Sequence, residues 1–256
     1  MPLAVCATPI GNLDDVTLRV LAELGQADVV LAEDTRHTRL LLERHGLEAR
    51  LLSFHEHNEE ERIALVSDAG LPGLSDPGLR LVRAARDAGL EVTVFPGASA
   101  VTTALVTSGL GDGRFLFVGF LPRRARALAA LWEALRWWDG AVVAFESPRR
   151  LPATLHSLAA AEPERRVAVC RELSKRFEEV VVGSATELAE RFTEPPKGEV
   201  TLVLGPGAGP PAERGADEAV EAVRELVAAG TPRRAAADVV ARLTGEPRNA
   251  LYRRSL

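Results

Sequence analysis

The chain is poor in the residues that cross-link proteins or anchor them in membranes. It has only two cysteines, Cys6 and Cys170, and each lies in an apolar, strand-like run, which predicts buried free thiols rather than a disulfide. The histidines show no metal-ligand spacing except His55-x-His57, which alone is weak, so no metal site is expected. No apolar run approaches the roughly 20 residues that cross a bilayer, and the first residues lead directly into a strand rather than a signal sequence. We therefore expect a cytoplasmic protein.

Lysine is also scarce, because arginine supplies 29 of the 31 basic residues. The net charge of −5 argues against indiscriminate binding of nucleic acid, yet the charge is segregated along the chain. Residues 114–150 and residues 233–256 each have a local balance of +4. The planar guanidinium group suits phosphate recognition, but a coding bias toward arginine on ordinary solvated surfaces explains the same numbers equally well.

The common nucleotide-binding fingerprints are missing, although glycine-rich turns are present. Apolar strands are predicted over 3–7, 63–67 and 91–95, and each runs into a turn rich in glycine and proline. None of the turns matches G-x-G-x-x-G or G-x-x-x-x-G-K-[ST], which disfavours NAD and ATP. Since ligands of open α/β sheets bind beyond the carboxyl ends of the strands, these turns predict a small-molecule site. A simple tight turn with capping aspartates is the alternative for Val66 to Gly78.

The pattern of strands and helices predicts an α/β protein with two α/β domains and a small helical module at the C-terminus. We expect the N-terminal domain over 1–112 to contain a largely parallel sheet, and the second domain over 113–205 to be partly antiparallel. Residues 206–215 are a linker by composition, and residues 216–256 resemble a helix-turn-helix module, with a helical cap or dimerisation arm as an equal alternative. The first helix is expected over 14–24. Trp132, Trp137 and Trp138 are expected to pack within a helical stretch over 125–138.

Eight ordered motifs extend over nearly the whole chain. They are Thr8-Pro-Ile-Gly-Asn-Leu13, Glu33-Asp-Thr-Arg36, Ser53-Phe-His-Glu-His-Asn-Glu59, Val66 to Gly78, Pro96-Gly-Ala-Ser-Ala100, Gly119-Phe-Leu-Pro122, Glu146-Ser-Pro148 and Arg171-Glu-Leu-Ser-Lys175. Together they resemble the ribosomal RNA small subunit methyltransferase I family, within the tetrapyrrole-methylase superfamily. The resemblance implies 2′-O-methylation of a cytidine ribose in the decoding region of 16S ribosomal RNA, with S-adenosylmethionine as cofactor and either free 16S ribosomal RNA or the small ribosomal subunit as partner. It also implies a homodimer, for which the surface from Trp132 to Trp138 could supply an apolar patch.

The resemblance implies a tetrapyrrole-methylase-like fold with the cofactor cleft between the two α/β domains, and places the cofactor against residues of both. These are Ile10, Gly11, Asp68, Leu71, Ser99, Ala100, Phe145 and Cys170. For Phe145 and Cys170 taken singly, plain core packing is the stronger interpretation. Basic residues are candidates for RNA contacts, with salt bridges as the alternative: Arg36, Arg123, Arg124, Arg149, Arg171, Lys175, Arg233 and Arg234.

Methyl transfer to a hydroxyl oxygen is an in-line displacement that needs alignment and exclusion of water rather than a covalent nucleophile. Because a ribose hydroxyl is a poor nucleophile, a base or an orienting charge would help. We expect Glu33 or Asp34 to orient the hydroxyl and His55 or Glu56 to accept its proton, although each is as well suited to stabilise a loop or cap a helix.

Two other functions fit parts of the pattern. Methylation of a tetrapyrrole carbon uses the same fold, but a planar macrocycle needs a broad apolar cleft and no basic tail. A non-catalytic RNA-binding factor would tolerate loss of the cofactor turns, and this chain keeps all of them.

Overall fold

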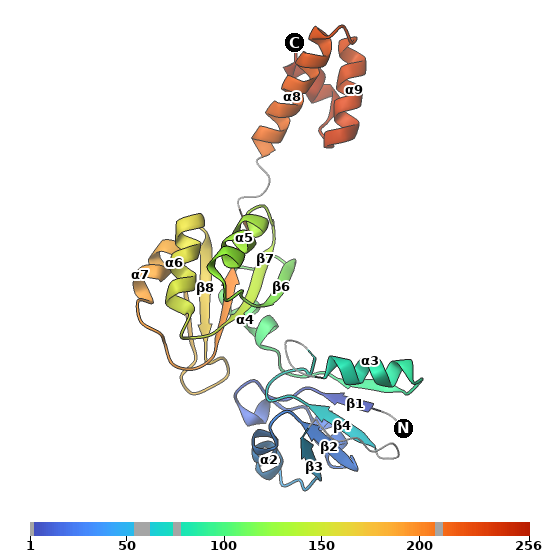
Figure 1. Cartoon of the computed structure of the whole chain (residues 1–256), viewed down its shortest axis with the longest axis vertical. Helices are drawn as coiled ribbons and strands as arrows, with labels where there is room; N and C mark the ends of the chain where they lie inside the picture. The colour runs from blue at the N-terminus through green and yellow to red at the C-terminus, as the bar shows by residue number, and fades with distance from the viewer. Residues whose placement is uncertain (1–2, 54–61, 74–77, 208–211) are drawn as a thin grey trace. The chain divides into compact units, whose positions relative to one another are not determined.

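The computed structural model describes residues 3–53, 62–73, 78–207 and 212–256 (Figure 1). The chain divides into two compact units. One comprises Met1–Trp132 and Gly140–Pro206 and holds two sheets, and the other comprises Glu133–Asp139 and Gly207–Leu256. The candidate site lies within the larger unit.

The first sheet has five parallel strands in the order β3-β2-β4-β1-β5. The strands are β1 (Leu3–Cys6), β2 (Val29–Ala32), β3 (Leu51–Ser53), β4 (Ile63–Val66) and β5 (Val92–Phe95). This confirms the predicted parallel sheet. Since all five strands run the same way, the turns after β1, β2, β4 and β5 emerge at one edge of the sheet.

Both faces of this sheet are buried, which explains why its strands are continuous apolar runs rather than alternating ones. On one face Ala4 and Cys6 pack in a cluster with α1 (Leu18–Leu24) and α2 (Thr35–Arg44). On the other face Leu3 and Val5 pack with α3 (Leu79–Asp87).

The helix expected over 14–24 is interrupted. A 3₁₀ turn, η1 (Leu13–Asp15), comes first, and α1 begins only at Leu18, because Thr17 adopts an extended backbone and caps the helix by accepting a hydrogen bond from the Val20 amide. The prediction of one continuous helix was therefore wrong.

The second sheet has the order β6-β7-β10-β8-β9. Its strands are β6 (Phe115–Phe120), β7 (Ala141–Glu146), β8 (Arg166–Arg171), β9 (Glu179–Ser184) and β10 (Val200–Leu204). Only β6 and β7 pair in parallel, and the other pairs are antiparallel, as expected.

The helix α4 (Ala100–Ser108) follows the last strand of the first sheet, yet its buried residues Val101 and Ala104 pack with residues of the second sheet. The remaining helices of this region are α5 (Ala125–Leu135), α6 (Leu151–Ala161) and α7 (Ala185–Arg191).

Trp132 packs in the core, as expected, and is therefore not part of the apolar surface patch considered for a dimer. Trp132 is only 1% exposed, and its indole N–H donates to the Ser157 hydroxyl at 3.1 Å. Trp137 is 46% exposed. The helix α5 ends at Leu135, so Trp137 is not part of the helical stretch expected over 125–138. The tertiary fold buries Trp132 as a core residue, so it cannot contribute to a dimer surface.

The described residues of the C-terminal unit form three helices around an apolar cluster. They are α8 (Ala212–Ala228), α9 (Arg233–Thr244) and α10 (Arg248–Arg254), and their cluster includes Val220, Val223 and Leu251. The first of them begins at Ala212, inside the segment expected to be a linker. Among the described residues, no helix combines the length and the apolar character that a membrane crossing requires.

Candidate active site

Three turns meet at the carboxyl edge of the first sheet. Thr8 and Gly70 exchange backbone hydrogen bonds of 2.8 and 3.1 Å, which join the turn after β1 to the turn after β4. The Ala7 amide donates to the Phe95 carbonyl at 3.1 Å, and the Thr8 hydroxyl donates to the Ser67 carbonyl at 3.0 Å. The glycine-rich turns predicted from the sequence therefore form one connected structure.

Two glycines permit backbone approaches that a side chain would prevent. A Cβ atom on Gly97 would come within 2.8 Å of the Ala7 Cβ, where the turns after β5 and β1 touch. A Cβ on Gly11 would come within 2.8 Å of the Leu173 carbonyl oxygen, in the connection between β8 and β9. The adjacent Asn12 amide donates to the Ser174 hydroxyl at 3.1 Å. Gly11 is thus needed where the first turn packs against a loop of the second sheet.

A cavity of about 400 Å³ opens beside these turns. Six of the eight predicted cofactor residues line it: Ile10, Leu71, Ser99, Ala100, Phe145 and Cys170. Residues outside the predicted cofactor set complete the lining, and more than half of them belong to the eight ordered motifs of the sequence: Ala69, Gly70, Val101, Phe120, Glu146, Ser147, Pro148, Leu173, Glu199, Val200 and Thr201. Most of these side chains are apolar, and Phe145 makes an edge-to-face contact with Phe120 at 5.5 Å between ring centroids.

The other two predicted cofactor residues, Gly11 and Asp68, line a second cavity of about 250 Å³. It shares Ile10, Ala69 and Glu199 with the larger cavity, so the two adjoin. His37 and Lys175 also line it. The larger cavity is thus mainly apolar, and the smaller cavity beside it also has charged side chains.

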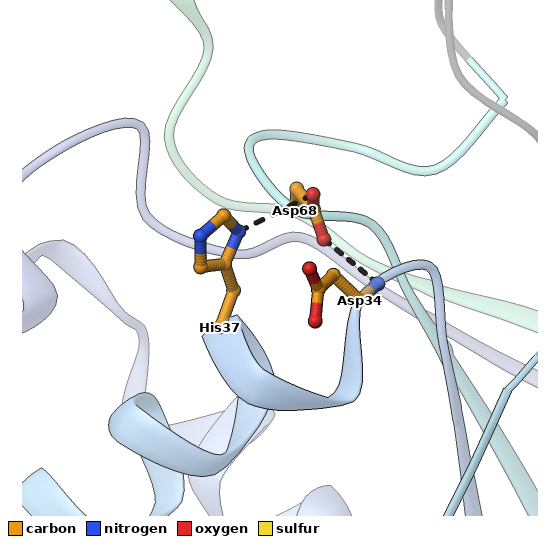
Figure 2. Close-up of side chains that lie close together, drawn as sticks. All are labelled: Asp34, His37 and Asp68. Atoms are coloured by element: carbon orange, nitrogen blue, oxygen red, sulfur yellow. Dashed lines mark hydrogen bonds and ion pairs between the residues drawn. The ribbon is translucent and has the colours of Figure 1, made fainter.

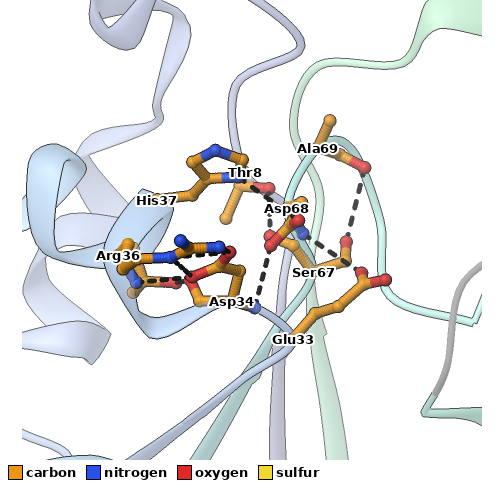
Figure 3. A network of polar contacts seen from close by, with 9 residues as sticks. Thr8, Glu33, Asp34, Arg36, His37, Ser67, Asp68 and Ala69 are labelled. Carbon is orange, nitrogen blue, oxygen red and sulfur yellow. Dashed lines mark hydrogen bonds and ion pairs between the residues drawn. The ribbon is translucent and has the colours of Figure 1, made fainter. Parts of the chain in front are cut away.

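Glu33 and Asp34, predicted to orient a hydroxyl, connect the end of β2 to the turn after β4 (Figure 3). The Asp34 amide donates to one Asp68 oxygen at 2.9 Å, and the Asp68 amide donates to Glu33 at 3.4 Å. The Asp34 carboxylate caps α2 and accepts hydrogen bonds from the Arg36 guanidinium, which hold the pKa of this carboxyl well below its usual range. Asp34 is therefore a capping residue whose carboxylate the Arg36 guanidinium keeps in the charged form at neutral pH. His55 and Glu56 lie outside the described residues.

His37 is a residue that the sequence analysis missed. It lies in the first turn of α2, and its Nδ1 is 3.3 Å from Asp68, so that His37, Asp34 and Asp68 gather at one place (Figure 2). The spacing of three residues between Asp34 and His37 at the start of α2 was the available signal for that pair. The ligand atoms of Asp34, His37 and Asp68 lie within 4.8 Å of one another and could hold a metal ion. Sequence spacing did not reveal that Asp68 joins the other two. Arg36 and the Asp34 amide already satisfy several of the carboxylate oxygens.

Glu146 is a buried carboxylate at the end of β7 that also lines the larger cavity. Its side chain is fully buried and pairs with Arg150 at 2.5 Å. It also accepts hydrogen bonds of 2.6 Å from the Thr154 hydroxyl and from the Ser147 amide. Arg150 in turn donates to the Leu121 carbonyl at 3.0 Å. This network fixes the Glu-Ser-Pro segment at the rim of the cavity.

Both cysteines are free and buried, as predicted. Burial raises the pKa of Cys6 and of Cys170 to about 12, with smaller contributions from nearby carboxylates. Each is thus a neutral thiol at physiological pH, so Cys170 contributes surface to the cavity and not a nucleophile.

The predicted RNA-contact residues fall into two groups. Four of them have partners within the protein. Arg36 pairs with Asp34, and Arg171 pairs with Glu179. Lys175 pairs with both Glu172 and Glu199, and Arg233 donates to the Ser255 carbonyl. For Lys175, burial opposes the charge, but the bonds to Glu199 and Glu172 outweigh it and raise the pKa. Arg123, Arg124, Arg149 and Arg234 are exposed on the surface.

Comparison with protein families gives two matches that together span most of the chain. Residues 2–189 match the model described as tetrapyrrole (corrin/porphyrin) methylases, and residues 214–256 match the model described as the RsmI C-terminal HTH domain. The curated protein named ribosomal RNA small subunit methyltransferase I of Mesorhizobium japonicum is 43% identical, with 99% of this chain and 91% of the relative covered. Its namesake from Haemophilus influenzae is 40% identical, with 98% and 94% covered.

Solved structures share the fold at low sequence identity. Cobalt precorrin-4 methyltransferase CbiF has a TM-score of 0.59 at 17% identity, covering 80% of this chain and 94% of that chain. A diphthine synthase has a TM-score of 0.57 at 16% identity, covering 80% and 90%. At these identities the likeness concerns the fold alone, which agrees with the architecture of two α/β sheets expected from the sequence.

Proposed function

This chain belongs to the ribosomal RNA small subunit methyltransferase I family, within the tetrapyrrole methylases, and we propose that it methylates the ribose 2′-oxygen of a cytidine in 16S ribosomal RNA. Members of this family are methyltransferases that take the methyl group from S-adenosylmethionine. The observation that carries the proposal is the pair of adjoining cavities at the carboxyl edge of the first sheet, one apolar and one charged.

The larger cavity suits S-adenosylmethionine in size and chemistry. Its volume of about 400 Å³ lies within the range of about 300 to 1,000 Å³ that small-molecule sites occupy. Ile10, Leu71 and Phe145 offer apolar surface, and Ser99 offers a hydroxyl that makes no capping bond to its own helix, α4. When bound there, the cofactor would supply an electrophilic methyl group on a sulfonium ion. The apolar lining would exclude water from the reacting atoms.

The smaller cavity is where we place the target nucleotide. Asp68, His37 and Lys175 line it, and they offer hydrogen-bond acceptors and a cation to a ribose and a phosphate. Arg123, Arg124 and Arg149, which are exposed in the same unit, would contact flanking phosphates. Glu33 and Asp34 would act indirectly, by holding the Asp68 turn in place. The homodimer expected from the resemblance stays a prediction, which light scattering can test.

A methyl-transfer assay tests the function directly. The protein is incubated with labelled S-adenosylmethionine and, separately, free 16S RNA, small subunits that lack the modification, and a tetrapyrrole precursor. We expect the label on a cytidine 2′-oxygen of the RNA, free or within the subunit. Label on the tetrapyrrole alone would favour the carbon methylase, and label on none of the three would favour a non-catalytic RNA-binding factor.

The C-terminal unit should contribute RNA affinity through exposed arginines of α9. Replacing Arg234 and Arg242 together by alanine should weaken RNA binding severalfold. The plot of log affinity against log salt concentration should also become less steep, by about 0.7 to 0.9 for each phosphate contact that is lost. Filter binding at several salt concentrations measures both quantities. Arg248→Ala is the matched control, since Arg248 already pairs with Asp238 at 3.2 Å and should matter less. An unchanged salt slope in the double variant would remove this unit from the RNA interface.

A further inference from the structure

We propose that Phe120 stacks on an unpaired base of the RNA substrate at the rim of the larger cavity, close to the target nucleotide, and that exposed arginines beside it bind phosphates of the same strand. This assignment rests on the proposed function, because it takes RNA as the methyl acceptor. The RNA contacts proposed above concern ribose and phosphate, whereas a stacked ring contacts a base. The substrate is then single-stranded where it crosses the site, since paired bases do not expose their faces.

Phe120 lines the larger cavity because a β-bulge interrupts β6. In the pairing of β6 with β7, Phe117 lies opposite Val143. Phe120 lies opposite Phe145, so a step of three residues along β6 matches a step of two along β7. Gly119 lies within the bulge with a φ of 68°, a conformation that favours glycine. Side chains alternate between the faces of a regular strand, so the bulge is what lets Phe117 and Phe120 both contact the Phe145 ring, at 5.0 and 5.5 Å between centroids.

Phe120 is the outer end of a row of residues that crosses the second sheet. The register aligns, on four neighbouring strands, residues that all line the larger cavity: Phe120, Phe145, Thr201 and Cys170. The strand β6 is at the edge of this sheet (Figure 1). Phe120 is 61% exposed there, whereas Cys170 at the inner end of the row is 1% exposed. The outer ring is therefore open to a ligand that arrives from solvent.

Exposed arginines lie on the two segments that border this ring. Arg123 and Arg124 follow β6, and Arg149 follows the Glu-Ser-Pro segment that lines the cavity. The guanidinium of Arg150 donates to the Leu121 carbonyl at 3.0 Å, which joins the two segments. An exposed aromatic ring among guanidinium groups suits a single strand of RNA, because a base stacks on the ring while phosphates bind the cations.

The stacked base would belong to a neighbour of the target nucleotide. Lys175, which lines the smaller cavity, follows β8, whereas Phe120 ends β6. These two strands are three strand spacings apart, which is about 14 Å at about 4.8 Å for each spacing. A ribose in the smaller cavity and its own base on Phe120 would be too far apart. One strand that passes over the cofactor cavity would reach both places with successive nucleotides.

Binding measurements on ring variants test the assignment. Phe120→Leu keeps an apolar side chain but removes the ring, and it should weaken binding to free 16S RNA or to small subunits by about 10-fold, as expected for one stacked base. The slope of log affinity against log salt concentration should not change, because no phosphate contact is lost. Phe120→Tyr keeps the ring and should recover most of the affinity. Val106→Leu is the control, since Val106 is also exposed and lies outside both cavities.

Several results would overturn the assignment. Unchanged RNA affinity in Phe120→Leu, or an equal loss in Phe120→Tyr, would show that the aromatic ring does not stack on RNA. A matching loss of calorimetric affinity for S-adenosylmethionine would place the ring against the cofactor instead. A different molar mass of Phe120→Leu in light scattering would place the ring in a contact between copies of the chain.

A second readout does not depend on methyl transfer. Phe120→Trp puts an indole at the same position, and stacking on a base should quench its fluorescence when free 16S RNA or small subunits are added. Val106→Trp is the control, because an indole at that position lies outside both cavities. Equal quenching in the two variants would refute the stacking. If the unmodified protein labels no RNA, the proposed methylation fails, yet the quenching still decides whether position 120 contacts RNA bases.

Discussion

Replacing Arg150 by methionine should lower the free energy of unfolding by about 3 to 5 kcal/mol, the usual cost of leaving a buried charge without its partner. Arg150 pairs with Glu146 at 2.5 Å, and the Glu146 side chain is fully buried. Without the guanidinium, the hydroxyl of Thr154 and the amide of Ser147 remain as donors, and neither carries a positive charge. Urea unfolding followed by fluorescence of the buried Trp132 measures the change.

Two further variants separate charge burial from loss of packing. The double change Glu146→Gln and Arg150→Met should lose less stability than Arg150→Met alone, because no uncompensated charge is then buried. Arg149→Met is the matched control, since Arg149 is the exposed neighbour and surface substitutions usually stay within about 0.5 kcal/mol. If the double variant is no more stable than Arg150→Met, burial of an unpaired charge is not the cause.

Replacing Ser99 by tryptophan should weaken the binding of S-adenosylmethionine by at least about 100-fold, which corresponds to about 2.8 kcal/mol. Ser99 lines the larger cavity at the N-cap of α4, where its hydroxyl makes no capping bond. The substitution therefore fills the cavity without removing a helix cap, and the fold should persist. Titration calorimetry of the unmodified and variant proteins provides the measurement.

The matching control changes another residue of the same helix. Val106 is 80% exposed and does not line the cavity, so Val106→Trp should leave cofactor affinity within about twofold of the unmodified protein. Circular dichroism spectra should be the same for all three proteins. A folded Ser99→Trp variant that binds the cofactor normally would show that the cofactor lies elsewhere.

Local sequence patterns determined much of the fold. The apolar runs over 3–7, 63–67 and 91–95 predicted β1, β4 and β5 to within one residue at each end. A parallel strand covered by helices is apolar along its whole length, and the sequence shows such a strand directly. The glycine-rich turns predicted the small-molecule site, because parallel strands direct their carboxyl ends to one edge. Four of the predicted cofactor residues lie on a single cavity for that reason: Ile10, Leu71, Ser99 and Ala100. Phe145 and Cys170 reach the same cavity from β7 and β8 of the second sheet.

Tertiary structure alone decided which side chains meet across strands. Asp68 and His37 are far apart in the sequence, and only the parallel pairing of β2 with β4 brings them within 3.3 Å. The burial of Trp132 is likewise a tertiary effect, because its helical pattern is compatible with either a core or a surface position. Residue spacing reports periodicity along one element, whereas the chemistry of this site arises from contacts between elements, and those depend on the order of strands in the sheet.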